Sequence, residues 1–324
     1  MAERTYIQAI TDGLRQEMRR DERVFVLGED VGVFGGAFKV THGLQEEFGS
    51  WRVIDMPISE TAIVGGATGA ALMGMRPVAE LQFSDFVSCA WDHLVTVAAK
   101  QHYRAGTPVP IVVRLPSGGG FSGGPFHSQN PESLCAHIPG LKVVCPATPA
   151  DAKGLLASAI ADPNPVLFFE HKYLYRRVRG DVPDERYLTP FGKARIHRSG
   201  DEITVVTWGA MVYTAEAAAD TVAKEGISVE ILDLRTLIPW DRETVLESAR
   251  RTSKVLVLHE DTRTGGFGAE IAATVAEEAF EHLDGPVQRI AAPDTPVPYS
   301  PQLEHAFIPQ LDDVVAGLRA LAAY

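Results

Sequence analysis

Residues 53–73 read Val-Ile-Asp-Met-Pro-Ile-Ser-Glu-Thr-Ala-Ile-Val-Gly-Gly-Ala-Thr-Gly-Ala-Ala-Leu-Met. The short apolar run Val53–Asp55 predicts a buried strand, and Glu60–Met73 predicts a helix. Residues 56–59 between them carry the chain from the end of the strand into the first turn of the helix. A strand followed at once by a helix is the repeating unit of α/β proteins, so this stretch decides the fold class.

The same alternation extends in both directions along the chain. A helix is predicted over Thr5–Arg20, where apolar residues recur at helical spacing, and another over Phe86–Arg104. Residues 148–151 (Thr-Pro-Ala-Asp) predict a further helix start, with a capping hydroxyl and a proline in the first position. More buried strands are predicted at Val24–Leu27, Val78–Phe83, Ile111–Leu115, Leu141–Val144 and Val166–Phe169. We therefore predict an α/β fold with a mostly parallel sheet covered by helices on both faces.

The periodicity weakens between Arg179 and Ser199 and then restarts. We predict a first domain over residues 1–185, a linker over 186–199 and a second, smaller α/β domain over 200–324. In the second domain, strands are predicted at Ile203–Thr207, Val229–Leu232, Val255–Leu258 and Val287–Ile290, and helices near Thr214–Lys224, Arg242–Arg251 and Ala269–Phe280.

Charge and cysteine content exclude several classes of function. The formal net charge of −12 over 324 residues argues against nucleic-acid binding, which needs clustered Lys and Arg. The three cysteines show no Cys-x-x-Cys spacing, so neither a disulfide framework nor a structural zinc site is indicated. No apolar run approaches the roughly 20 residues that cross a bilayer, and the start of the chain lacks the pattern of a secretory signal. We expect a cytoplasmic protein.

Glu60 is the first candidate for chemistry, because it lies where a buried strand hands over to a helix. In open parallel sheets, ligands bind beyond the carboxyl ends of the strands. The helix after Glu60 is rich in Ala and Gly, which suits a close approach of another backbone or a partner surface. The structural alternative is that Ser59 caps the helix and Glu60 only favours its positive end.

His127 is the second candidate, and it follows a loop with glycines at 118, 119, 120, 123 and 124. Such a loop can fold against a ligand or a neighbouring subunit and carry an imidazole that exchanges protons near neutral pH. A surface-loop histidine is the alternative. Residues 120–124 also match the Gly-x-Ser-x-Gly nucleophile elbow, but further glycines precede them and Pro125 follows, which is the wrong context for a serine hydrolase.

The sequence as a whole resembles the beta subunits of the pyruvate, branched-chain 2-oxo acid and acetoin dehydrogenase complexes. Ordered matches run over nearly the entire chain. They are Leu27–Gly32 (Leu-Gly-Glu-Asp-Val-Gly), Pro57–Glu60 (Pro-Ile-Ser-Glu), Arg76–Phe83, His127–Gln129 (His-Ser-Gln), Pro139–Val144, Asp151–Leu156 and Asp233–Leu237. The resemblance implies a transketolase-like pyrimidine-binding domain followed by a transketolase C-terminal-like domain.

The resemblance implies that thiamine diphosphate is the cofactor and that Glu60 activates it. In the family, this glutamate is hydrogen-bonded to the aminopyrimidine ring, and proton exchange with the ring generates the reactive carbon of the cofactor. Burial against the ring is expected to raise the pKa of such a carboxyl. By the same resemblance, the pyrimidine pocket is lined by Glu29, Ile58, Gln82 and Phe86, and His127 assists acyl transfer to a lipoyl group.

The family also often holds a potassium ion through main-chain carbonyls. The matching positions are Ile111, Ala159, Ile160, Asp162 and Asn164, and Pro163 between the last two is a local departure.

Part of the cofactor site is missing from this chain. Enzymes of this kind hold the diphosphate and Mg²⁺ with a Gly-Asp-Gly stretch and paired asparagines, and the sequence contains neither Gly-Asp-Gly nor Asn-Asn. In the family, the alpha subunit carries these ligands. The resemblance therefore implies an alpha2-beta2 heterotetramer that also binds a dihydrolipoyl acyltransferase core with its lipoyl domain.

The substrate stays open at this point. A branched-chain 2-oxo acid or pyruvate is expected, with acetoin as the alternative, because residues 137–140 and 170–172 lean towards acetoin enzymes. An alternative of a different class is an assembly subunit that keeps the fold without taking part in catalysis, although the presence of Glu60 and His127 argues against it.

Overall fold

The computed structural model describes all 324 residues, and the chain divides into two compact units. The first unit contains Met1–Ser117 and Leu134–Phe191, and the second contains Gly118–Ser133 and Gly192–Tyr324. The units change at residues 191/192, which lie inside the predicted linker 186–199. The glycine-rich loop belongs to the second unit by its contacts, whereas the prediction placed it in the first domain.

The first unit is built on a parallel sheet with the strand order β6-β7-β5-β4-β2-β3. Its strands are β2 (Val24–Gly28), β3 (Val53–Asp55), β4 (Arg76–Glu80), β5 (Val112–Ser117), β6 (Lys142–Val144) and β7 (Val166–His171). A separate antiparallel pair joins β1 (Ala2–Thr5) to β8 (Arg179–Val182). The helices are α1 (Tyr6–Arg20), α2 (Leu44–Phe48), α3 (Glu60–Leu72), α4 (Ala99–Ala105), α5 (Glu132–Ala136), which crosses the unit boundary, α6 (Pro149–Ala161) and α7 (Leu174–Arg177).

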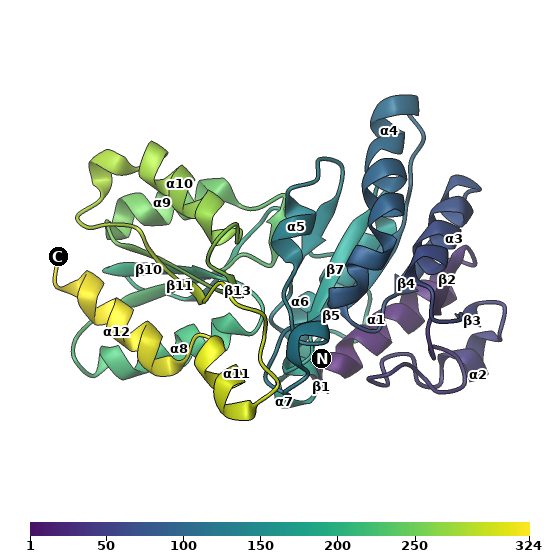
Figure 1. Cartoon of the computed structure of the whole chain (residues 1–324), viewed down its shortest axis with the longest axis horizontal. Coiled ribbons are helices and arrows are strands. Elements are labelled where there is room, and N and C mark those ends of the chain that lie inside the picture. Colours follow the sequence, from purple (N-terminus) through teal and green to yellow (C-terminus); the bar gives the residue numbers. More distant parts are fainter. The chain divides into compact units, whose positions relative to one another are not determined.

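The second unit has a five-stranded sheet in the order β14-β13-β10-β11-β9. Its strands are β9 (Arg195–Arg198), β10 (Ile203–Thr207), β11 (Val229–Asp233), β13 (Val255–Thr262) and β14 (Gln288–Ala292), and a short strand β12 spans Thr236–Ile238. Its helices are α8 (Met211–Ala223), α9 (Arg242–Thr252), α10 (Gly268–Glu278), α11 (Pro301–Phe307) and α12 (Leu311–Ala322), with single 3₁₀ turns η3 (Gly124–Phe126) and η4 (Phe280–His282). Figure 1 shows α9 and α10 on one face of this sheet and α8 and α12 on the other.

The predicted α/β class with mostly parallel sheets is confirmed, and most predicted elements have counterparts. Three details were wrong. The predicted strand Val78–Phe83 ends at Glu80, and the predicted helix over Phe86–Arg104 is a 3₁₀ helix η1 (Ser84–Ala90), a π-helix η2 (His93–Ala98) and then α4. The edge strand β9 lies inside the predicted linker, because Arg-Ile-His-Arg has too few apolar residues to reveal a strand.

Helix α1 shows how the first unit is fixed locally. The Thr5 hydroxyl accepts from the Gln8 N–H at 3.3 Å, and the Gln8 side chain accepts from the Thr5 N–H at 2.9 Å, which is a capping box. On the inner face, Ile10, Leu14 and Met18 are fully buried. Burial of side chains of this size stabilises a fold by roughly 1.5–3 kcal/mol each.

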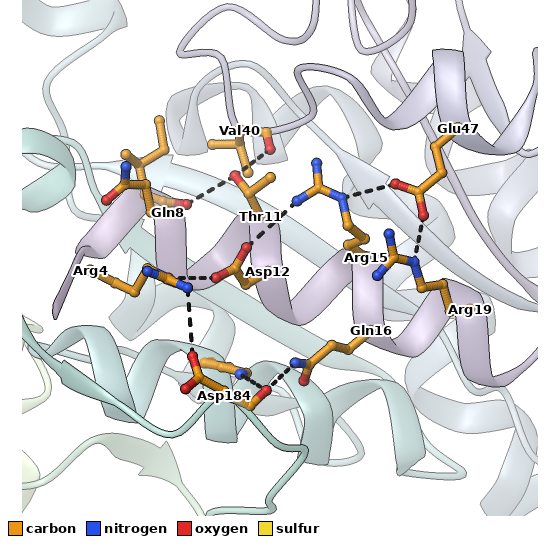
Figure 2. A network of polar contacts seen from close by, with 12 residues as sticks. Arg4, Gln8, Thr11, Asp12, Arg15, Gln16, Arg19, Val40, Glu47 and Asp184 are labelled. Carbon is orange, nitrogen blue, oxygen red and sulfur yellow. Dashed lines mark hydrogen bonds and ion pairs between the residues drawn. The ribbon is translucent and has the colours of Figure 1, made fainter. Parts of the chain in front are cut away.

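The outer face of α1 is held by a polar network (Figure 2). Arg15 and Arg19 both reach the carboxylate of Glu47, with Nε–Oε distances of 3.0 and 2.5 Å. Arg4 forms an ion pair with Asp12, with 2.9 Å between Nε and Oδ2. Exposed pairs of this kind contribute about 0–1 kcal/mol each, so the apolar face does more to fix the helix.

None of the helices is long and apolar enough to span a membrane.

Candidate active site

The predicted cofactor residues meet at one edge of the first sheet. Strand β2 pairs in parallel with both β3 and β4, and the register sets Gly28 opposite Asp55 and opposite Glu80. The chain therefore leaves all three strands at the same level, where ligands bind in sheets of this type. The segments that follow these strands carry Glu29, Ile58, Glu60, Gln82 and Phe86.

Hydrogen bonds tie the three segments together. The Met56 N–H donates to the Gly28 carbonyl at 2.9 Å, and the Gln82 amide donates to the Asp30 carboxylate at 3.2 Å. Gln82 and Phe86 are half-buried, whereas Ile58 is 84% exposed and presents a large apolar side chain at the edge. The edge thus combines polar groups with apolar surface.

Glu29 is a buried acid with an unused acceptor. Only 5% of the residue is exposed, and its Oε1 atom has no hydrogen-bond partner within the chain. Burial raises the pKa of its carboxyl, and the negative charges of Glu60, Asp30 and Glu80 raise it further. A buried polar atom without a partner is rare in native folds, so this oxygen has the environment of a ligand-binding group.

Glu60 opens helix α3, as predicted. Ser59 stands at the N-cap position but its side chain makes no capping hydrogen bond, so the alternative of a simple serine cap has no support. The Glu60 side chain is half-buried and its charge reaches Glu29. A Cβ at position 65 would lie 2.9 Å from the Nε2 atom of His93, so a larger residue there would require the imidazole to shift.

A buried ion cluster lies next to this edge, and sequence reasoning missed it. Arg114 in β5 is fully buried and donates to Glu170 through Nε and Nη2, both at 2.6 Å, and to Glu80 through Nη1. The Tyr175 hydroxyl donates to Glu170 at 2.7 Å. Burial raises the pKa of Glu80 although the guanidinium opposes this. The available signal was a single arginine inside the apolar run Ile111–Leu115, since a buried charge needs partners.

His127 belongs to the second unit, and the loop around it is well defined. Its Nδ1 atom lies 3.3 Å from the Gly123 carbonyl, and the His127 N–H donates to the Gly124 carbonyl at 3.3 Å. Because a carbonyl oxygen only accepts, the proton of a neutral ring sits on Nδ1 and the lone pair on Nε2. The residue is half-buried.

The loop is not a nucleophile elbow. Strand β5 ends at Ser117, five residues before Ser122, and the next helical element is the single 3₁₀ turn Gly124–Phe126. An elbow needs a strand directly before the serine and a helix directly after it. The geometry therefore gives no support to a serine hydrolase.

The predicted potassium ligands lie near the ends of α6 and β5, where some carbonyls converge. The carbonyls of Ile160 and Asp162 both accept from Nη1 of Arg76, at 2.7 and 3.3 Å. The Ile111 carbonyl accepts from the Val166 N–H at 3.0 Å, and the Ala159 carbonyl accepts from the Asp162 N–H at 3.3 Å. At Asn164, the side-chain oxygen meets His102 Nδ1 at 2.6 Å. No group of three or more His, Cys, Asp or Glu side chains is placed to hold a metal ion.

Comparison with known proteins defines the fold family of the chain. Residues 2–178 match the family "Transketolase, pyrimidine binding domain" and residues 192–314 match "Transketolase, C-terminal domain". A solved structure titled "Split gene transketolase, inactive beta4 tetramer" superposes with a TM-score of 0.81 and 22% identity, covering 98% of each chain. At this identity, the likeness speaks for the fold alone. The protein is thus a two-domain α/β protein of the transketolase type.

Relatives with higher sequence identity identify the family of the chain within this class. The 2-oxoisovalerate dehydrogenase subunit beta of Bacillus subtilis is 49% identical, with all of both chains covered. The pyruvate dehydrogenase E1 component subunit beta of the same organism is 45% identical, again with all of both chains covered. An Arabidopsis thaliana protein named 2-oxoisovalerate dehydrogenase subunit beta 2, mitochondrial, is 46% identical over 98% of this chain and 88% of its own length. The chain belongs to the family of beta subunits of 2-oxo acid dehydrogenases.

Proposed function

We propose that this chain supplies the activating half of a thiamine diphosphate site in a 2-oxo acid dehydrogenase that acts on a branched-chain 2-oxo acid or pyruvate. The observation that carries the proposal is the buried, unpartnered Oε1 of Glu29 beside Glu60 at the carboxyl edge of β2, β3 and β4. Two neighbouring carboxyls, apolar surface and an amide suit an aminopyrimidine ring, which offers both hydrogen-bond donors and acceptors.

In this proposal each residue of the edge has a separate task. Bound thiamine diphosphate supplies a nucleophilic carbon and accepts the electron pair that decarboxylation releases. Glu60 exchanges a proton with a pyrimidine nitrogen, and Glu29 uses its free Oε1 for a polar atom of the same ring. Ile58, Gln82 and Phe86 would line the pocket that holds the ring, with apolar surface from Ile58 and Phe86 and an amide from Gln82.

We propose that His127 assists the transfer of the acyl group to a lipoyl group. Its support is the 3.3 Å contact between Nδ1 and the Gly123 carbonyl, which orients the ring and, in the neutral tautomer with the proton on Nδ1, makes Nε2 the basic nitrogen. Substitution of His127 by Ala is expected to slow acyl transfer more than decarboxylation measured with an artificial electron acceptor.

The proposal requires a partner. This sequence lacks the Gly-Asp-Gly and Asn-Asn stretches that hold the diphosphate and Mg²⁺, so we assign these ligands to an alpha subunit in an alpha2-beta2 heterotetramer. Helix α3 exposes small residues at Ala62, Gly66 and Gly69, which suits close packing of another helix. An acyltransferase core with its lipoyl domain would accept the product. Because all three cysteines are free, we place the complex in the cytoplasm.

We also propose that potassium binds at the carbonyls of Ile111, Ala159, Ile160, Asp162 and Asn164. The convergence of the Ile160 and Asp162 carbonyls on one nitrogen of Arg76 supports a cation position there. Each carbonyl has a second lone pair, so an ion would share these oxygens with the guanidinium.

The names of the similar relatives favour 2-oxo acids over acetoin, and a decarboxylating enzyme over a purely structural subunit. The test is co-expression with an alpha subunit from the same organism, followed by assays of the decarboxylation of 2-oxoisovalerate and pyruvate and of the oxidative cleavage of acetoin. Turnover of a 2-oxo acid that needs both chains and the cofactor is the expected result. Tight cofactor binding and turnover by this chain alone would contradict the proposed division of the site.

A further inference from the structure

One buried carboxylate accepts hydrogen bonds from both sides of the loop around His127. Glu304 in α11 is only 4% exposed. Its Oε2 accepts from the Ser122 N–H at 2.9 Å and more weakly from the Ser122 hydroxyl at 3.4 Å, and its Oε1 lies 3.4 Å from the Ser128 hydroxyl. Ser122 precedes His127 and Ser128 directly follows it, so a single side chain fixes both limbs of the loop.

A second buried acid holds the entrance of the same loop. The Gly119 N–H donates to Oε1 of Glu260 in β13 at 2.7 Å, and Glu260 is 6% exposed. A Cβ atom at position 119 would lie 3.2 Å from Glu304 Oε1 and 3.5 Å from Glu260 Oε1. Both carboxylates therefore converge on the loop at Gly119.

The loop backbone is strained and tightly packed at the same place. Ser122 has a φ of +60°, which is unusual for a residue other than glycine, and its N–H is the group bound by Glu304. Gly124 has a φ of +69°, and a Cβ there would lie 2.3 Å from the Tyr299 ring. Strained backbone persists only where the surroundings determine it strongly, and it concentrates at functional sites.

The orientation of the imidazole depends on this loop conformation. The carbonyl that lies near His127 Nδ1 belongs to Gly123, between the residue bound by Glu304 and the glycine packed against Tyr299. A shift of this carbonyl would change the rotation of the ring and the direction of Nε2. A displacement of about 1 Å can cost about 10²-fold in rate at a reacting group.

We propose that Glu304, assisted by Glu260, is a positioning residue that orients His127 for acyl transfer. This inference rests on the proposed role of His127. Glu304 itself does not contact the substrate in this scheme; it acts only through the loop.

The test uses the assembled enzyme and separates two half-reactions. With Glu304→Ala, kcat for acyl transfer to a free lipoyl domain is expected to fall by about 10²-fold. Decarboxylation with an artificial electron acceptor should stay near wild type. Glu304→Gln should recover part of the transfer rate, because its amide oxygen still accepts one hydrogen bond. The matched control is Glu277→Ala, an exposed acid on a helix of the same unit.

The double variant distinguishes positioning from a general loss of structure. His127→Ala with Glu304→Ala should be no slower than His127→Ala alone, because Glu304 has nothing left to orient. Multiplicative losses, or an equal fall of both half-reactions, would overturn the proposal. Ser122→Gly keeps the N–H and removes the weak hydroxyl bond, so it should transfer acyl groups at nearly the wild-type rate.

A readout without substrate keeps this proposal separate from the proposed function. In a sample with ¹⁵N-labelled histidine, the ring signals of His127, assigned from their loss in His127→Ala, should form one sharp set that broadens or splits in Glu304→Ala. If no 2-oxo acid is turned over but this change occurs, the proposed function fails and the positioning role stands. Unchanged His127 signals would refute the positioning role whatever the activity.

Discussion

The carboxyl edge of the first sheet and the loop around His127 are assembled in opposite ways. At the edge, backbone pairing sets Gly28 level with Asp55 and Glu80, so the residues that follow reach one place with little help from side chains. At the loop, side chains far along the sequence do the work: the partners of Gly119 and Ser122 are 141 and 182 positions away. The positions of the edge residues are thus set by the backbone of the sheet. The conformation of the loop instead depends on each of the distant carboxylates that bind it.

The largest expected effect tests the edge at its reacting group. Glu60→Gln removes the exchangeable proton and is expected to reduce decarboxylation by about 10²–10⁴-fold. The proposed heterotetramer should remain intact, since the backbone register does not depend on this side chain. The matched control is Glu46→Gln, an exposed acid in the first turn of α2. Near wild-type turnover by Glu60→Gln would remove Glu60 from the mechanism.

The second prediction concerns the buried ion cluster beside the edge. Arg114→Met leaves the carboxylates of Glu80 and Glu170 buried without their cation, and is expected to lower the free energy of unfolding by about 3–5 kcal/mol. Chemical denaturation at neutral pH measures the change. Arg20→Met, which breaks a partly exposed pair with Glu17, should have a much smaller effect. Similar losses in both variants would show that the buried cluster is not special.

The third prediction concerns the support of the loop. The His259 ring stacks on Trp208 with centroids 5.4 Å apart, and Trp208 donates to Glu132 at the end of the loop at 3.0 Å. Burial lowers the pKa of His259 from 6.5 to about 4. The folded-state pKa is depressed, so burial of the neutral ring carries no protonation penalty above pH 6.5. As the pH falls from 6.5 towards 4, the unfolded state takes up a proton that the folded state does not, and the folded state loses stability.

His259→Phe keeps a stacked ring and removes this titration. Relative to wild type, the variant should gain stability as the pH falls through this window, by about 3 kcal/mol at its lower end. Burial also raises the pKa values of Glu132 and Asp261, which act in the opposite direction, so the difference between variant and wild type isolates the histidine. A constant difference between pH 7.5 and 4 in denaturation curves would contradict the assignment.

The smallest expected effect is that of potassium. At equal ionic strength, KCl should raise the melting temperature above the value in NaCl by a margin that corresponds to about 1 kcal/mol or less. Arg76→Leu should enlarge the difference, because the guanidinium no longer shares the Ile160 and Asp162 carbonyls. Identical melting in both salts for both proteins would argue against a potassium site.

The sequence predicted the edge better than the loop for a physical reason. Apolar runs such as Val53–Asp55 identified strands, so Glu60 could be placed at a carboxyl edge from the order of strands and helices, and the resemblance added Glu29. The resemblance to a family located His127. Nothing local in the sequence indicated that Glu304 holds the loop, because a hydrogen bond between residues 122 and 304 leaves no periodic trace.

Two further misses have similar causes. Strand β9 has the sequence Arg-Ile-His-Arg, and its pairing with β11 comes from the sheet and not from its own composition. Arg114 lies inside the apolar run Ile111–Leu115, and its carboxylate partners are 34 and 56 positions away. In each case the deciding interaction is non-local.

The path of the backbone between the two units limits how this gene could be recombined. The chain passes from one unit to the other at residues 117/118, 133/134 and 191/192. In a chimera that joins residues 1–191 to the remainder of a relative, the loop segment 118–133 would come from this chain. The carboxylates at positions 260 and 304 that bind it would come from the relative. An exchange that moves residues 118–133 together with 192–324 takes the loop and its carboxylate partners from the same protein. We therefore expect functional chimeras to exchange these two stretches as a pair.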